Sequence, residues 1–221
     1  KAMVDLCHSQ SVPVLIDAAQ SVGMLPLTLD QLGADFYAFT GHKWWCGPAG
    51  VGGLYIHPDA LTEVTPTFIG WRGIRIDAEA NPVGWQPDGR RFEIATSDGT
   101  LWPALRAAID YHDRWGTAEQ RYFRICQLSS YLWGRLNRLP QIECLLKSPP
   151  ESGLVSFQIM REGEPVPALH AHLVKVLEAQ SIYLRTLLSP SCVRACTHYF
   201  TLESELDQLI EAIEAFLLQE I

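Results

Sequence analysis

Long hydrophobic runs are missing from this sequence of 221 residues. Its apolar stretches are only a few residues long and are bounded by glycine or proline, whereas a membrane-spanning helix needs about 20 consecutive apolar residues. The first residues also lack the order of a signal peptide, in which a basic segment precedes an apolar one. We therefore expect a cytoplasmic protein with no membrane partner.

Basic residues are scarce. Lysine and arginine together number 17 against 25 aspartates and glutamates, which gives a formal net charge of −8. Proteins that bind nucleic acids or anionic membranes need a basic face to displace counterions. The composition therefore argues against a nucleic-acid partner and leaves room for small anionic ligands held at local sites.

Closely paired cysteines are absent as well. The six cysteines are scattered without C-x-x-C spacing, so we expect free thiols in a reducing compartment and no disulfide framework or structural zinc site. Cys192, Cys196 and His198 lie close together in the sequence and could in principle bind a metal. Because such groupings arise often by chance, we expect no metal here.

The order of short apolar runs and helical patterns in this sequence is typical of an α/β protein. Hydrophobic residues make up 48% of it, enough for one large domain or two modest ones. The first third alternates short apolar runs with helical patterns, and the continuous runs at 14–16 and 36–39 are typical of parallel strands buried on both faces. We predict strands at 13–17, 34–39 and 51–57, with a short helix near 28–32.

Later segments indicate a second, smaller domain. Residues 62–100 are rich in Gly, Pro, Trp and Arg without periodicity, so we expect loops that wrap a site or a partner subunit. Amphipathic helices are predicted from Pro103 and through 122–136. The remainder predicts a strand at 153–159, a helix near 166–180, strands at 182–185 and 193–196, and a last helix from Glu203. We expect one domain at 1–115 and an α+β domain at 116–221.

The residues with the most specific chemistry follow two of the predicted strands. Asp17 closes one apolar run, and Lys43 follows the other. In α/β proteins with parallel sheets, ligands bind at the carboxyl ends of the strands, where both residues are expected. A carboxylate buried at a strand end can hold the proton on the ring nitrogen of pyridoxal phosphate (PLP), and we expect Asp17 to be such a carboxylate. A lysine amine can bond to the aldehyde of PLP. Gln20 could reach the phenolic oxygen, while Thr40 and His42 could hold the phosphate.

Each of these residues also has a plainer interpretation. Asp17 could be a helix N-cap, residues 41–43 a solvated turn, and Gln20 a surface side chain. The combination is more specific than its parts, because five residue types occur in register and Gly50, Gly52 and Gly53 open the next strand. We therefore favour the cofactor site.

The paired motifs Asp17-x-x-Gln20 and Thr40-x-His42-Lys43 resemble the class V aminotransferases, which are fold-type I PLP enzymes and include cysteine desulfurases, kynureninases and selenocysteine lyases. The resemblance implies PLP as cofactor and a mainly parallel sheet with flanking helices. It also implies that Asp17 and Gln20 contact the pyridine ring, that Thr40 and His42 bind the phosphate, and that Lys43 is the catalytic lysine. By the same resemblance about 170 residues would precede Lys1, so we expect a C-terminal portion of the complete enzyme.

Two further segments resemble parts of the family. Residues 91–96 (RFEIAT) resemble a motif whose threonine reaches the phosphate of the other subunit, which implies a homodimer in which Thr96 serves the partner's site. Ala95 departs from the usual glycine, and a plain helix-entry residue is the alternative. Residues 192–201 (CVRACTHYFT) resemble the segment whose arginine binds the substrate α-carboxylate, which makes Arg194 a bidentate clamp. A surface ion pair with a glutamate at 203 or 205 is the alternative for Arg194.

The segment before Arg194 indicates which reaction to expect. Cysteine desulfurases place a nucleophilic cysteine on a loop there, whereas residues 184–191 (LRTLLSPS) contain none. Together with residues 70–72 (GWR), the tail resembles the cyanobacterial cysteine and cystine C-S lyases. That resemblance implies β-elimination of cystine or cysteine to pyruvate, ammonia and a persulfide or sulfide. The same motifs would also serve a desulfurase, an aminotransferase or an epimerase, and a truncated PLP-fold module without activity is the non-enzymatic alternative.

Overall fold

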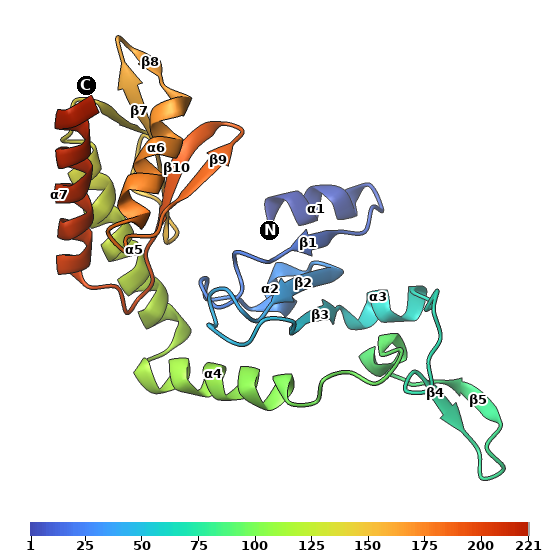
Figure 1. Ribbon diagram of the computed structural model, residues 1–221. Helices are drawn as coiled ribbons and strands as arrows, with labels where there is room; N and C mark the ends of the chain where they lie inside the picture. Colours follow the sequence, from blue (N-terminus) through green and yellow to red (C-terminus); the bar gives the residue numbers. More distant parts are fainter. Residues whose placement is uncertain (221) are drawn as a thin grey trace. The chain divides into compact units, whose positions relative to one another are not determined.

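The computed structural model describes residues 1–220. The chain divides into two compact units, one comprising Lys1–Trp115 and the other beginning at Gly116, and each is described by itself (Figure 1). Among the helices of residues 1–220, none is long and apolar enough to span a membrane.

A mixed sheet of three strands forms the centre of the first unit. Its strands are β1 (Leu15–Asp17), β2 (Phe36–Thr40) and β3 (Gly52–Ile56), in the order β1-β2-β3. β1 and β2 are parallel, because the chain returns through α2 (Leu29–Leu32) before β2 begins. β3 is antiparallel to β2, and the connection between them, residues 41–51, contains no helix that would carry the chain back to the start of the sheet. The α/β fold class is confirmed.

The remaining helices of this unit are α1 (Ala2–Ser9), α3 (Pro58–Glu63) and α4 (Leu101–Trp115). α4 buries Leu105 and His112, two turns apart on the face that its sequence pattern predicts. Tyr37 of β2 and Trp44 in the following turn are 1% and 3% exposed, so the centre of the unit lies beside that turn.

The prediction that 62–100 forms only loops is wrong in part. A hairpin joins β4 (Ile74–Ile76) to β5 (Pro82–Trp85), and a 3₁₀ turn spans Gly89–Phe92. Both strands are short and most of their residues are exposed, so the alternation of buried and exposed residues that reveals a strand is missing.

The second unit is an antiparallel sheet covered by helices. Its strands run in the order β6-β7-β10-β9, with β8 paired to β7. The strands are β6 (Ile142–Cys144), β7 (Leu154–Arg161), β8 (Glu164–Pro165), β9 (Arg185–Leu188) and β10 (Ser191–Cys196). The helices are α5 (Ala118–Leu136), α6 (Pro167–Glu178) and α7 (Glu203–Glu220).

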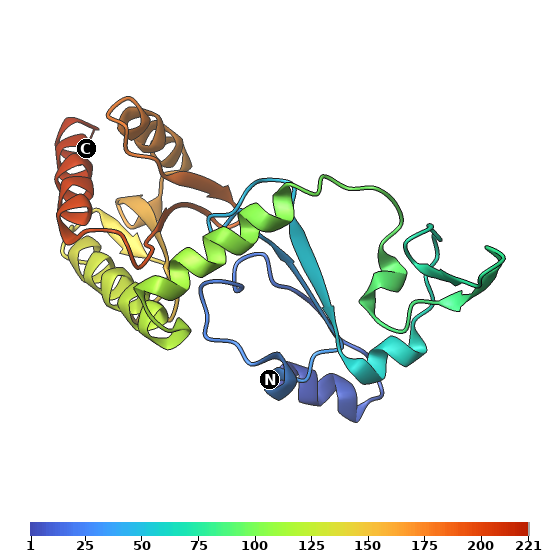
Figure 2. The same ribbon diagram turned by 90° about the horizontal axis from the view of Figure 1, so that it is seen from below.

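One face of this sheet forms the hydrophobic core. Val155, Phe157 and Ile159 alternate along β7 and are at most 1% exposed, and α5, α6 and α7 pack on their side of the sheet (Figure 2). Residues at the intervening positions, such as Ser156 and Arg194, belong to the opposite face. This is the α+β arrangement expected for the tail, although β6 and β8 were too short to predict.

Candidate active site

Two of the candidate cofactor residues end neighbouring strands. Asp17 is the last residue of β1 and pairs with Ala38, while Thr40 is the last residue of β2. Because β1 and β2 are parallel, their carboxyl ends meet at one edge of the sheet. The structure thus brings Asp17 and Thr40 to the same edge, and His42 and Lys43 follow directly in the next turn.

Asp17 does not cap a helix. Its Oδ1 accepts a hydrogen bond of 3.0 Å from the Ala19 amide, but the residues that follow form turns rather than a helix. The side chain is also exposed, whereas the ring-nitrogen role assumed a buried carboxylate. The reason is that β1 lies at an edge of the described sheet, so no strand covers the end of β1 on its outer side.

Lys43 projects from a closed turn that comprises residues 41–47, here called the lysine turn. The Gly47 amide donates to the Gly41 carbonyl at 2.9 Å, and the Cys46 amide donates to the Lys43 carbonyl at 2.9 Å. The Gly41 amide donates to the Val51 carbonyl at 2.8 Å, which ties the turn to the start of β3. Lys43 itself is exposed, so its amine is accessible on a fixed backbone.

Helix α4 holds this turn from a second direction. A Cβ atom on Gly41 would lie 2.8 Å from Leu105 Cδ1, and one on Gly47 would lie 2.7 Å from Leu105 Cδ1 and 2.9 Å from the Gly41 carbonyl oxygen, so the turn packs closely against α4 and Gly47 leaves no room for a side chain. His112 Nε2 lies 2.9 Å from the Trp45 carbonyl oxygen. A carbonyl only accepts, so this nitrogen carries the proton and donates. The lysine turn is therefore fastened to both the sheet and α4.

Gln20 is bonded to the lysine turn. Trp44 Nε1 donates to Gln20 Oε1 at 3.0 Å, and the Gln20 side chain is half-buried. The interpretation of Gln20 as a free surface residue is therefore wrong. This hydrogen bond joins the turn after β1 to the turn after β2, the two segments that carry the paired motifs.

The Thr40 hydroxyl provides a test of whether PLP fits this edge. Among the side chains of residues 1–220, its Oγ1 is the buried oxygen that lacks a hydrogen-bond partner. A buried hydroxyl without a partner is costly, and a phosphate oxygen would accept its hydrogen bond. His42, two residues later, is exposed. The donors at this edge therefore fit a phosphate group.

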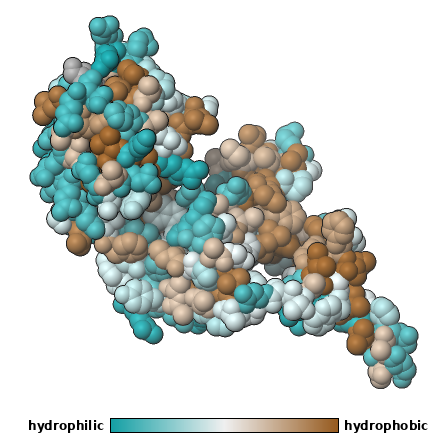
Figure 3. Space-filling model, in the orientation of Figure 1, coloured by the Kyte–Doolittle hydropathy of each residue, from teal (hydrophilic) through white to brown (hydrophobic). Residues whose placement is uncertain are grey.

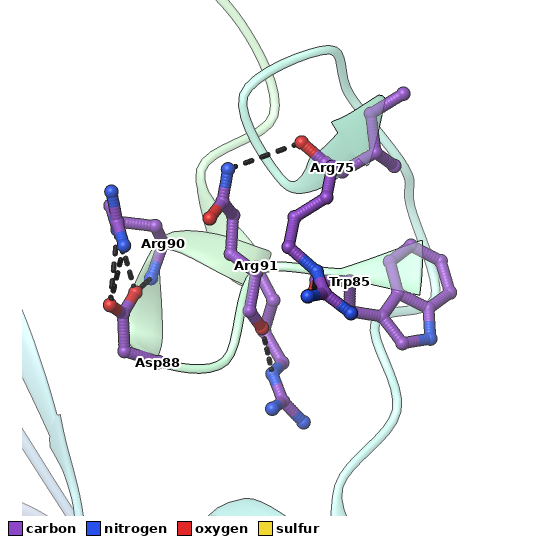
Figure 4. A network of polar contacts seen from close by, with 7 residues as sticks. Arg75, Trp85, Asp88, Arg90 and Arg91 are labelled. Atoms are coloured by element: carbon purple, nitrogen blue, oxygen red, sulfur yellow. Dashed lines mark hydrogen bonds and ion pairs between the residues drawn. The ribbon is translucent and has the colours of Figure 1, made fainter. Parts of the chain in front are cut away.

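The segment before Thr96 is held by arginine side chains (Figure 4). Arg91 donates from Nε to the Gln86 carbonyl at 3.2 Å and from Nη1 to the Leu61 carbonyl at 3.1 Å. Arg75 Nε donates to the Trp85 carbonyl at 3.0 Å across the hairpin. The arginine of the RFEIAT motif thus has a structural role, since it fixes the course of the chain toward Thr96.

Thr96 does not begin the following helix. α4 starts at Leu101, and the carboxylate that accepts the Thr100 amide, at 2.9 Å, belongs to Asp98. The helix-entry interpretation of Thr96 is therefore wrong. Thr96 is exposed on the connection that precedes α4, as a residue that serves a partner would be.

In the second unit, Arg194 lies on the face of the sheet opposite the helices. It pairs with Ser156 of β7 on one side and with Arg185 of β9 on the other. The alternative ion pairs are wrong: Glu203 bonds Arg124 at 2.8 Å, and Glu205 accepts from the Leu202 amide at 2.8 Å.

Arg185 is a candidate that the sequence did not reveal. Side chains directly opposite each other on neighbouring strands share a face, and like charges in that position repel. Two arginines in register therefore suit a ligand with more than one negative group. Their nine-residue separation gave no signal, because the pairing depends on the hairpin between β9 and β10.

The two buried cysteines of this unit, Cys192 and Cys144, are poor nucleophiles. Cys192 is fully buried, and burial raises the pKa of its thiol, although Ser156 and Arg194 act in the opposite direction. Burial also raises the pKa of the Cys144 thiol to about 11. The turn between β9 and β10 consists of Ser189 and Pro190 alone, so no loop is present there to carry a cysteine.

The fold and these residues define an α/β protein with a phosphate-compatible site at the carboxyl ends of its parallel strands. Residues 1–208 match the family model of the class V aminotransferases. The chain therefore belongs to the class V aminotransferase family, as its motifs predicted.

The chain is also similar to individual relatives and solved structures. The cysteine desulfurase of Haloferax volcanii is 30% identical over 228 residues, which cover 96% of this chain and 51% of the relative. Isopenicillin N epimerase of Streptomyces clavuligerus is 28% identical, with 96% and 55% covered. The cystine C-S lyase C-DES bound to its product cysteine persulfide is 52% identical with a TM-score of 0.84, covering 90% of this chain and 51% of that one. The chain spans about half the length of the curated relatives it matches.

Proposed function

We propose that the complete protein is a PLP-dependent C-S lyase that converts cystine, or cysteine, by β-elimination. With cystine and water the products are pyruvate, ammonia and cysteine persulfide. The observation that carries this proposal is the tight connection between β9 and β10, where a desulfurase needs a loop with a cysteine. β-Elimination needs no cysteine nucleophile, because the sulfur leaves with its electron pair from Cβ.

Each candidate residue has a defined part in cofactor binding. When bound, PLP supplies an electron sink for the bond that is broken at Cα. Asp17 would hold the proton on the ring nitrogen, Gln20 would donate to the phenolic oxygen, and Thr40 and His42 would bind the phosphate. Lys43 would bond to the aldehyde and, once released by the substrate amine, take the proton from Cα.

The arginines of β9 and β10 support a substrate with two carboxylates. Cystine carries one α-carboxylate at each end, whereas cysteine carries one in total. We assign Arg194 to the carboxylate of the half that reacts, as the family resemblance implies, and Arg185 to that of the other half. Guanidinium groups suit this task because they bind a carboxylate through two parallel hydrogen bonds.

A homodimer with Thr96 at the partner's phosphate site remains part of the proposal, as does a cytoplasmic location. Apolar surface gathers over α1 and over the segment that follows α3 (Figure 3). Phe68 and Trp71 in that segment are 73% and 65% exposed. Large exposed apolar side chains close together are typical of protein interfaces, which supports a partner for this segment.

The products distinguish the lyase from its alternatives. We expect the complete protein to convert cystine to pyruvate and cysteine persulfide in equal amounts, without alanine. Alanine with persulfide would indicate a cysteine desulfurase, the second candidate, which the Haloferax volcanii relative favours. A second amino acid formed from an added keto acid would indicate an aminotransferase, inverted stereochemistry an epimerase, and failure to bind PLP an inactive module.

A further inference from the structure

Trp44 is a buried residue whose polar atom points at a candidate cofactor ligand. It follows Lys43 directly and is 3% exposed, yet its indole Nε1 donates a hydrogen bond of 3.0 Å to Gln20 Oε1. A Trp side chain in a core needs a partner for this N–H group, and here the partner is a residue of the Asp17-x-x-Gln20 motif.

The direction of this hydrogen bond fixes the orientation of the amide. A glutamine side chain has an oxygen that accepts and an NH₂ group that donates, whereas an indole N–H can only donate. The indole therefore selects the oxygen of Gln20. The NH₂ group is left as the end of the amide that a ligand can meet.

We propose that Trp44 is a positioning residue that holds the Gln20 amide so that Nε2, and not Oε1, faces the phenolic oxygen of PLP. The proposal rests on the proposed function. It adds to that function the residue that sets the orientation of Gln20, because the Gln20 amide can donate to the phenolic oxygen in only one of its two orientations. A flipped amide would lose the indole hydrogen bond and set its oxygen against a negatively charged oxygen, which is unfavourable.

Two measurable properties depend on this orientation. A donor to the phenolic oxygen strengthens cofactor binding. It also stabilises the negative charge on that oxygen, which lowers the pH at which the visible absorbance of the bound cofactor changes. One net hydrogen bond corresponds to about a two- to tenfold change in affinity and about 0.4 to 1 unit in the pH midpoint.

The test uses Trp44→Phe in the complete protein, which keeps an aromatic ring and removes the N–H group. Trp133→Phe is the matched control, because Trp133 Nε1 also donates at 3.0 Å, to the Leu146 carbonyl in the second unit. We expect Trp44→Phe to weaken PLP binding about two- to tenfold and to raise the pH midpoint by about 0.4 to 1 unit, and Trp133→Phe to change neither.

A double-mutant cycle with Gln20→Leu shows whether Trp44 acts through Gln20. We expect Trp44→Phe to have no further effect on the pH midpoint once Gln20 is leucine. An equal effect in both backgrounds, or no effect in either, would overturn the proposal. A wild-type protein without a visible band would instead refute the proposed function itself, and the positioning role with it.

A second measurement does not depend on the folding of Trp44→Phe. In protein labelled with ¹⁵N-tryptophan, the Trp44 indole N–H resonance of the cofactor-free form should shift when Gln20 is replaced by leucine, while that of Trp133 should stay in place. An unchanged Trp44 resonance would show that the hydrogen bond is absent and would contradict the proposal.

Discussion

Replacing His170 tests the account of the second unit through both stability and pH. His170 lies on α6, is 1% exposed, and accepts a hydrogen bond of 2.9 Å at Nε2 from the Ile159 amide of β7. Its Nδ1 lies 3.1 Å from the Ser191 hydroxyl at the start of β10. One imidazole thus joins a helix to two strands, and it can accept from Ile159 only while Nε2 is unprotonated.

The size of the expected stability loss follows from the Ile159 amide, which would lose its hydrogen-bond acceptor. His170→Phe keeps a ring of similar size but removes the acceptor of the buried Ile159 N–H group. An unsatisfied buried donor costs about 1–3 kcal/mol, so we expect the free energy of unfolding to fall by that amount at pH 8. Urea unfolding of the complete protein measures it through the transition midpoint.

The pH dependence has a definite sign. Burial lowers the pKa of His170 below its usual value of 6.5, so folding favours the neutral imidazole. Its contribution to stability is therefore fully present above pH 6.5 and is lost as pH falls toward the folded-state pKa. The free energy of unfolding falls by at most about 1.4 kcal/mol per pH unit through this group. His170→Phe has no imidazole at this position, so its stability does not change with pH in this way.

We therefore expect the difference in the free energy of unfolding between wild type and His170→Phe to shrink as the pH is lowered from 8 to 5.5. The control is His172→Phe on the same helix, whose side chain is 46% exposed and whose ring meets Phe216 edge to face. We expect the control to change stability by no more than about 0.5 kcal/mol. A difference for His170→Phe that stays constant or grows at low pH would refute the reasoning.

Three further substitutions test the site. Thr40→Val should weaken PLP binding about two- to tenfold in a binding titration, yet leave the urea midpoint of the cofactor-free protein unchanged or slightly raised, because the buried hydroxyl that is removed has no partner within the described protein; a large loss of stability would contradict this. Arg185→Gln should lower kcat/KM for cystine at least about tenfold more than for cysteine, whereas Arg194→Gln should lower both; equal effects of Arg185→Gln would argue against a second carboxylate site. Cys192→Ala should retain more than about half of the wild-type rate of pyruvate formation from cystine, since burial raises the pKa of that thiol; loss of the activity in a folded variant would restore the desulfurase alternative.

The motif residues could be predicted because their chemistry is local in the sequence. Asp17 and Thr40 end strands whose apolar runs are plain to see, and parallel pairing then brings them to one edge. Periodicity also predicted the helices well, and the last helix begins at Glu203 as expected. In these segments one face is buried against the core, so the pattern of burial is written in the sequence.

What could not be predicted depends on contacts between distant segments. The hydrogen bond from Trp44 to Gln20 and that from His112 to the Trp45 carbonyl arise only when the chain is folded. Arg185 faces Arg194 only through the register of a hairpin. The exposure of Asp17 was also missed, since a sequence pattern does not tell whether a neighbouring strand covers the end of β1.

The most direct test of the central claim is the visible absorbance of the complete protein with PLP, compared among wild type, Lys43→Ala and Lys147→Ala. Lys147 is an exposed lysine that pairs with Glu143 and serves as the control. We expect a band near the violet edge of the visible range in the wild type and in Lys147→Ala, and its loss in Lys43→Ala. A band that persists in Lys43→Ala would contradict the assignment of Lys43 as the lysine that bonds the cofactor.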